Sequence, residues 1–151
     1  MMEQMQLGTL HNDLGCSYDA NSFGERYHWY SSTGWVMWNA QVAGLQRGCT
    51  VVIFDGNPTG PKDKPDMTTL WRFAARHGVT FFGVGAAFYA LCAKVDIDPA
   101  ECGDLRRIRA LGSTGSPLSE DVQKWGTAFM RKAGVAGDGG QGVWWCNISG
   151  G

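Results

Sequence analysis

Short apolar runs alternate with segments of helical periodicity along most of the chain. Strand-like runs, rich in β-branched and aromatic residues, cover residues 26–32, 49–56, 79–84, 108–113 and 143–149. Between them, apolar residues recur every three or four positions over 34–48, 66–78, 86–95 and 117–132. The run 49–56 is almost wholly apolar, as in a strand covered on both faces. This order predicts an α/β fold of βαβ units, with a mostly parallel sheet flanked by helices.

The first predicted helix carries an apolar stripe. Trp35, Trp38, Val42 and Leu45 recur at helical spacing, which predicts that they face the core. Trp35 alone among them is also a candidate for a binding site. In the second helix, Asp66 is predicted to be the N-terminal cap.

Ligands of parallel α/β sheets bind beyond the carboxyl ends of the strands. The predicted ends are residues 31–34, 55–57, 83–85, 112–117 and 147–151, and four of these five consist of small residues. Several such ends on one edge suggest a cleft that lets a ligand approach the backbone. Packing alone also favours glycine in these turns, so a plain scaffold without a ligand stays open.

The loop LGSTGSPLSED, residues 111–121, tests whether this edge is a phosphate site. We predict Ser116 as the helix cap and Pro117 as the first helical residue. Glu120 and Asp121 then lie in the first turn, where they complement the helix dipole and repel a phosphate. No Lys or Arg lies between Arg109 and Lys124. The loop is therefore either a neutral surface for a flat base or an acyl group, or an ordinary turn that caps a helix.

Composition narrows the function classes. A net charge of −1 with scattered basic residues gives no case for nucleic acid or an anionic membrane as partner, and no apolar run approaches a membrane span. The three histidines lack metal-ligand spacing, so we expect no metal site. Five cysteines form no CxxC pair and no export signal precedes them, which favours a reducing cytosol.

Four segments in one order resemble the acyl-adenylate-forming ligases, the acyl-CoA synthetases. They are YHWYSSTGWVMWN (27–39), GVTFFGVGAAFYALC (78–92), LGSTGSPLSED (111–121) and WWCNISGG (144–151). The resemblance extends over nearly the whole chain from about Met2. It implies a two-step reaction in which ATP and a carboxylic acid form an acyl-adenylate and pyrophosphate, and the thiol of coenzyme A then displaces AMP.

The resemblance also assigns residues to three parts of a site. The nucleotide-binding residues it implies are Gly115, Ser116, Pro117, Asn147, Ile148, Ser149, Gly150 and Gly151. Those of the acyl pocket are Trp35, Met37, Thr114 and Gly150. Those near coenzyme A are Thr59, Gly83, Val84, Gly85 and Ala86. No residue is assigned a catalytic role, because this chemistry needs no general base or nucleophile from the protein.

One difference from the family's sequence pattern narrows the range of possible acid substrates. Acetate-using relatives carry two tryptophans where this chain has Ser149 and Gly150. Glycine leaves room for a longer acid, so the resemblance implies a pocket of acetoacetate size. The alternatives are a ligase for acetate, propionate or another short acid, and a non-catalytic module that binds a nucleotide or an acyl group.

Several parts of the family's machinery match no segment of the 151 residues. They are the phosphate-binding loop with its lysine, the acid that serves Mg²⁺, the aspartate that binds ribose, and the small C-terminal domain with the adenylation lysine. We therefore expect residues 1–151 to be an interior segment of an AMP-binding domain, inactive in isolation. ATP, coenzyme A and Mg²⁺ are the cofactors implied, with the Mg²⁺ ligands outside this chain, and no protein partner is evident.

Overall fold

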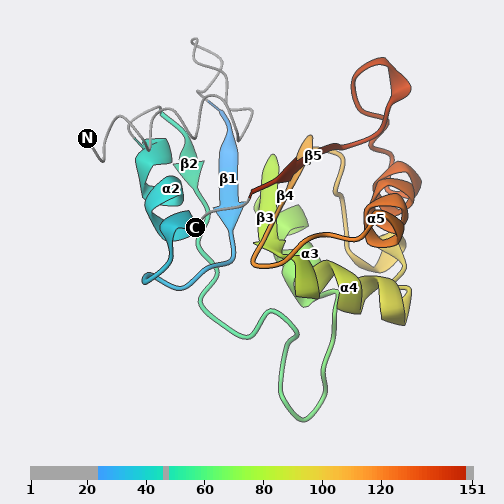
Figure 1. Ribbon diagram of the computed structural model, residues 1–151, viewed down its shortest axis with the longest axis horizontal. Coiled ribbons are helices and arrows are strands. Elements are labelled where there is room, and N and C mark those ends of the chain that lie inside the picture. The colour runs from blue at the N-terminus through green and yellow to red at the C-terminus, as the bar shows by residue number, and fades with distance from the viewer. Residues whose placement is uncertain (1–23, 46–47, 149–151) are drawn as a thin grey trace.

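Within the described residues, the sheet has five parallel strands. The computed structural model describes residues 24–45 and 48–148. Strand order is β2-β1-β3-β4-β5, and every neighbouring pair is parallel (Figure 1). The strands are β1 (Arg26–Trp29), β2 (Thr50–Val51), β3 (Phe81–Gly85), β4 (Ala110–Thr114) and β5 (Trp144–Asn147). This arrangement confirms the predicted parallel α/β fold.

In the part of the chain that the structure describes, four α-helices and two short 3-10 helices accompany the strands. They are α2 (Val36–Gly44), α3 (Thr69–Arg76), α4 (Ala86–Val95), η4 (Pro99–Glu101), α5 (Glu120–Lys132) and η5 (Asp138–Gly140). Helix α2 packs on one face of the sheet, beside β1 and β2. Helices α3, α4 and α5 lie on the opposite face (Figure 1). Within the described ranges, none of these helices is long and apolar enough to cross a membrane.

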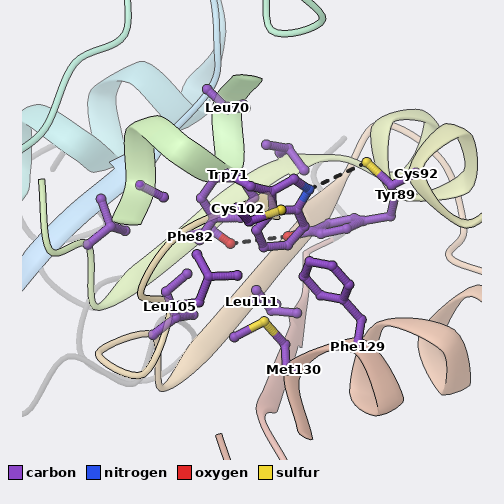
Figure 2. Packing of buried hydrophobic residues seen from close by; sticks show 14 of the residues in the cluster. Leu70, Trp71, Phe82, Tyr89, Cys92, Cys102, Leu105, Leu111, Phe129 and Met130 are labelled. Carbon is purple, nitrogen blue, oxygen red and sulfur yellow. Dashed lines mark hydrogen bonds between the residues drawn. The ribbon is translucent and has the colours of Figure 1, made fainter. Parts of the chain in front are cut away.

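The larger core lies under α3, α4 and α5, and aromatic rings dominate it. The indole of Trp71 stacks on Phe82 with ring centroids 4.4 Å apart and packs against Phe129 at 4.9 Å (Figure 2). The buried Tyr89 hydroxyl lies 3.1 and 3.0 Å from the carbonyl oxygens of Phe82 and Gly112, between which its single proton is shared. Tyr89 thereby ties α4 to both central strands.

The cysteines of this core are buried thiols. Trp71 Nε1 donates to Cys92 Sγ at 3.5 Å (Figure 2). Burial raises the pKa of Cys92 to about 11 and that of Cys102 to about 12. Both side chains stay protonated at neutral pH and act as small apolar groups.

A second, smaller core lies under α2 and is centred on Trp29. Trp29, Gly83 and Gly112 occupy one row across β1, β3 and β4. A Cβ atom at Gly83 would lie 2.2 Å from the Trp29 ring, and one at Gly112 would lie 2.3 Å from it. The two glycines thus leave the space that the indole fills.

Strand β2 is much shorter than predicted. The run 49–56 was expected to be a fully covered strand, but only Thr50 and Val51 form ladder pairs, with Arg26 and Tyr27. β2 lies at the edge of the described sheet, with β1 alone beside it. Beyond Val52 the chain leaves β1, and the Ile53 side chain is 56% exposed.

The predicted core face of α2 is wrong. Trp35, Val42 and Leu45 are exposed, whereas the buried side includes Met37, Ala40 and Gln41. The sheet-facing side also carries Ala43 and Gly44, whose small size lets the helix approach the sheet closely. Close approach of small side chains therefore outweighs the larger apolar stripe on the opposite side of α2.

The helix caps also differ from the prediction. Asp66 lies ahead of α3, where its carboxylate accepts hydrogen bonds from the Thr68 backbone N–H at 2.9 Å and the Thr68 hydroxyl at 2.6 Å. These bonds and the neighbouring Arg72 lower the pKa of Asp66 to about 2. The helix cap itself is Thr68, so Asp66 organises the preceding turn instead.

His28 is buried on the face of β1 that packs against Phe73 and Phe82. Its Nδ1 donates to the Val52 carbonyl oxygen at 2.8 Å, so in the neutral ring Nε2 is the unprotonated nitrogen. Nε2 has no hydrogen-bond partner among the described residues. Burial is the main cause that lowers the pKa of His28 to about 4.

Substituting Gly112 by alanine tests how closely the Trp29 indole packs on the sheet. We expect Gly112→Ala to lower the free energy of unfolding by about 1–3 kcal/mol in urea denaturation, because the methyl group overlaps the ring. Gly85→Ala is the matched control, since a Cβ there meets nothing closer than 3.8 Å. In a Trp29→Leu background the cost of Gly112→Ala should shrink; an unchanged cost would contradict the packing described.

The buried His28 predicts a loss of stability in acid. The unfolded chain binds a proton near pH 6.5, whereas the folded chain does so only near pH 4. The free energy of unfolding should therefore fall as the pH drops through this interval, by about 3 kcal/mol in total. His28→Gln keeps a donor for Val52 but cannot titrate, so its stability should fall less over the same interval. Equal falls in urea denaturation of both proteins would refute this role.

Candidate functional site

A cleft of about 500 Å³ opens at the carboxyl edge of the sheet, beside α2. Its size falls within the range of ~300–1,000 Å³ found for small-molecule sites. One side is the start of α2, and the others are the β4–α5 loop and the end of β5. The lining residues are Trp35, Val36, Met37, Thr114, Gly115, Ser116, Pro117, Leu118, Asn147 and Ile148.

The cleft brings together two groups of residues that the family resemblance assigned separately. From the acyl-pocket group it contains Trp35, Met37 and Thr114. From the nucleotide group it contains residues 115–117 together with Asn147 and Ile148. Segments about a hundred positions apart in the sequence thus meet at one edge, as the strand-end rule predicts.

Two hydrogen bonds fix the sheet side of the cleft. The Thr114 hydroxyl donates to the Ile148 carbonyl oxygen at 2.9 Å, and the Ile148 N–H donates to the Ser113 carbonyl oxygen at 2.8 Å. They hold the chain after β5 alongside the end of β4. The backbone at Thr114 and Ile148 is therefore well defined before any ligand binds.

The electrostatic character of the cleft is neutral. None of its lining residues carries an ionisable side chain. Its polar side-chain groups are the hydroxyls of Thr114 and Ser116 and the amide of Asn147. Such a surface suits an uncharged heteroaromatic base or an acyl chain, and it offers no cation to a phosphate.

The β4–α5 loop reaches the cleft because the helix begins later than predicted. Ser116 was expected to cap α5, but the cap is Ser119, whose hydroxyl oxygen accepts from the Val122 N–H at 3.4 Å. Gly115 has a φ of +89°, and a Cβ there would meet no atom within 4 Å. Ser116 and Pro117 consequently belong to an exposed turn on the cleft rim.

The predicted coenzyme A residues lie apart from the cleft lining. Gly83 and Val84 are buried within β3, and Ala86 is buried at the start of α4. Gly85 pairs in register with Thr114 and so adjoins the cleft edge. Thr59 lies on the β2–α3 connection, where its hydroxyl donates to Asn57 Oδ1 at 2.9 Å.

Three of the predicted site residues, Ser149, Gly150 and Gly151, lie outside the described residues. Two cleft residues, Val36 and Leu118, were not predicted. Both directly adjoin predicted residues in the sequence, which is the signal that could have included them.

Other hollows on the surface are rimmed by charged side chains. The hollow between α5 and the start of β5 contains Arg106 and Arg109. Arg106 forms an ion pair with Asp104 at 2.7 Å, and Arg109 forms one with Glu25 at 2.9 Å. These guanidinium groups are already paired, so the neutral cleft is the stronger candidate.

Comparisons with known proteins agree on one enzyme family. No family model matches the chain. Acetoacetyl-CoA synthetase of Danio rerio is 38% identical over 97 residues, which cover 64% of this chain and 14% of that protein. The synthetase of Rhizobium meliloti is 37% identical over 98 residues, covering 65% of this chain and 14% of that protein.

Solved structures extend the similarity to the fold. Acetoacetyl-CoA synthetase from Streptomyces lividans superposes with a TM-score of 0.79 and 37% identity, over 99% of this chain and 21% of that one. A luciferase-like enzyme from Zophobas morio shares the fold at a TM-score of 0.56 and 18% identity, over 87% of this chain and 27% of that one.

The chain spans about a seventh of the length of the curated relatives and about a fifth of the solved synthetase. The similarity therefore concerns one part of those proteins. In sequence and in fold, the chain is similar to a part of the acetoacetyl-CoA synthetases.

Proposed function

We propose that the chain forms the adenine-binding surface and part of the acyl pocket of an ATP-dependent ligase that joins acetoacetate to coenzyme A. The observation that carries this proposal is the neutral cleft, in which α2, the β4–α5 loop and the end of β5 meet. The similarity to acetoacetyl-CoA synthetases supports the same assignment. The chain itself would be part of a larger AMP-binding domain.

In the proposed reaction, a carboxylate oxygen of acetoacetate attacks the α-phosphorus of ATP, and pyrophosphate leaves. The thiol of coenzyme A then attacks the acyl carbon, AMP departs and the thiol proton passes to solvent. No cleft residue can exchange a proton at neutral pH, so the chain's contribution is to bind and orient the reacting groups.

The cleft offers separate surfaces for the base and the acid. Gly115 presents no side chain, so a flat ring can lie against the backbone of the β4–α5 loop. Trp35 and Met37 bring apolar surface from α2, which suits the methyl end of the acid. Thr114 lies at the end of β4, and we assign it to the boundary between base and acid.

The charged parts of the substrates need groups from elsewhere. Mg²⁺ prefers carboxylate and carbonyl oxygens with water, and no carboxylate lines the cleft. The residues of the cleft do not fit a Mg²⁺ site, so no step is assigned to the metal here. For coenzyme A we retain Thr59 and residues 83–86 as the proposed contacts, with Gly85 nearest the cleft.

We assign the reaction to the cytosol. The described cysteines, Cys49, Cys92, Cys102 and Cys146, are all buried thiols, which suits a reducing compartment.

Adenine binding can be tested with AMP and the 151-residue chain. On titration with AMP, we expect the amide resonances of Gly115, Ser116 and Ile148 to shift in ¹H–¹⁵N spectra. Gly115→Ala should lower the AMP affinity at least tenfold (~1.4 kcal/mol), because its methyl group occupies the space where the base lies.

Gly139→Ala is the matched control. Gly139 also has a positive φ, +63°, and open space at its Cβ, but it lies in η5 and does not line the cleft. Both substitutions place alanine at a positive φ, so Gly139→Ala controls for this kind of backbone strain. Equal affinities of the two variants, or no shift in the wild-type chain, would overturn the proposed function.

A further inference from the structure

Strand β1 loses its neighbour β2 close to the cleft, while its pairing with β3 continues. The N–H groups of Thr50 and Val52 donate to the carbonyl oxygens of Glu25 and Tyr27, both at 2.8 Å. If this parallel ladder continued, the Trp29 N–H would donate to Val52 and the Trp29 carbonyl would accept from residue 54. The chain instead leaves β1 after Val52, and His28 Nδ1 takes the Val52 carbonyl at 2.8 Å.

The side-chain amide of Gln41 replaces the missing strand. Its Oε1 accepts from the Trp29 N–H at 3.1 Å, and its Nε2 donates to the Trp29 carbonyl oxygen at 2.6 Å. Gln41 is 2% exposed, so an apolar substitute would leave two backbone groups of β1 buried without partners. One side chain of α2 therefore completes the hydrogen bonding of β1.

The pairing of Gln41 with Trp29 affects the position of Met37, which lines the cleft. It follows Met37 by four residues, one turn along the buried side of α2. Met37 lines the cleft and is itself 2% exposed. The position of Gln41 along β1 thus fixes the position of the α2 wall.

Trp29 connects this wall to the opposite one. Its backbone holds Gln41, while its indole fills the space left by Gly83 and Gly112 on β3 and β4. Two residues beyond Gly112, Thr114 forms the sheet side of the cleft. Trp29 therefore contacts the elements that form both walls of the cleft.

We propose that Gln41 is a positioning residue for the cleft: its amide, paired with both backbone groups of Trp29, sets the separation between the α2 wall and the β4–β5 wall. The effect on ligand binding rests on the proposed function, whereas the effect on cleft geometry does not. Gln41 is not among the residues that line the cleft, so its proposed effect passes through Trp29 and Met37.

The test uses Gln41→Met in the 151-residue chain, because methionine has a similar length and cannot form either hydrogen bond. We expect amide hydrogen exchange at Trp29 to accelerate about tenfold or more. The methyl resonance of Met37 and the amide resonances of Thr114 and Gly115 should shift without any ligand. The affinity for AMP should fall at least fivefold.

Val135→Ala is the matched control for a general loss of stability. Val135 is buried in the larger core on the other face of the sheet and does not line the cleft. We expect it to lower the unfolding midpoint while leaving the resonances of Met37, Thr114 and Gly115 in place. If the two variants, compared at equal stability, shift these resonances alike, Gln41 has no positioning role.

Gln41→Glu provides a rescue that a merely structural role would not produce. A protonated carboxyl group can donate to the Trp29 carbonyl and accept from the Trp29 N–H, as the amide does, whereas a carboxylate cannot donate. The cleft resonances of this variant should therefore resemble wild type in acid and Gln41→Met in alkali.

His28 precedes Trp29 and also titrates, so the same pH series on wild type and on Gln41→Met serves as reference. If Gln41→Glu behaves alike at both pH values, or Gln41→Met leaves the cleft resonances unchanged, the proposal is overturned.

The two proposals fail in different ways. If AMP causes no shifts in the wild-type chain, the proposed function fails, but the ligand-free resonances still decide the role of Gln41. If AMP binds wild type and Gln41→Met with the same affinity while the cleft resonances move, the effect of Gln41 on cleft geometry is supported and its predicted effect on AMP binding is overturned.

Discussion

The close contact between the Trp29 indole and the central strands is the constraint on which the α2 side of the molecule depends. The indole lies where side chains at Gly83 and Gly112 would otherwise stand, so it covers β3 and β4 at short range. Helix α2 then packs over it through Met37 and Ala40, both buried in the same cluster. The distance from α2 to the sheet, and with it the depth of the cleft, follows from how closely this ring approaches the backbone.

Because the chain after β2 leaves the sheet, polar side chains form hydrogen bonds that a longer β2 would have formed. Backbone groups at the end of β1 would be buried without partners if nothing replaced β2. Gln41 supplies the replacement for both backbone groups of Trp29, and His28, on the opposite face of β1, pairs with the Val52 carbonyl that Trp29 would otherwise use. Both are buried polar side chains that hydrogen-bond to backbone groups, Gln41 to Trp29 and His28 to Val52. The end of β2 and the α2 wall of the cleft are therefore linked, because Gln41 of α2 takes the place of β2 beside Trp29.

The order of strands and helices could be predicted from periodicity, because βαβ units leave a strong local pattern. The edge at which the cleft lies followed from the strand-end rule, and the proposed role of residues 115–117 comes from the family resemblance. The buried side of α2 could not be predicted, since Trp35 and Leu45 are more apolar than the Ala40 and Gln41 that face the sheet. That choice depends on helix-to-sheet distance, which no local pattern contains. Gln41 gave only the signal of an amide within an apolar segment.

The proposed adenylate cleft is tested most directly by intermolecular nuclear Overhauser effects between AMP and the chain. We predict contacts from the adenine ring protons to the backbone of Gly115 and Ser116. Contacts to the charged hollow beside Arg106 and Arg109 in their place would contradict the assignment of the base to this cleft, because that hollow lies away from α2.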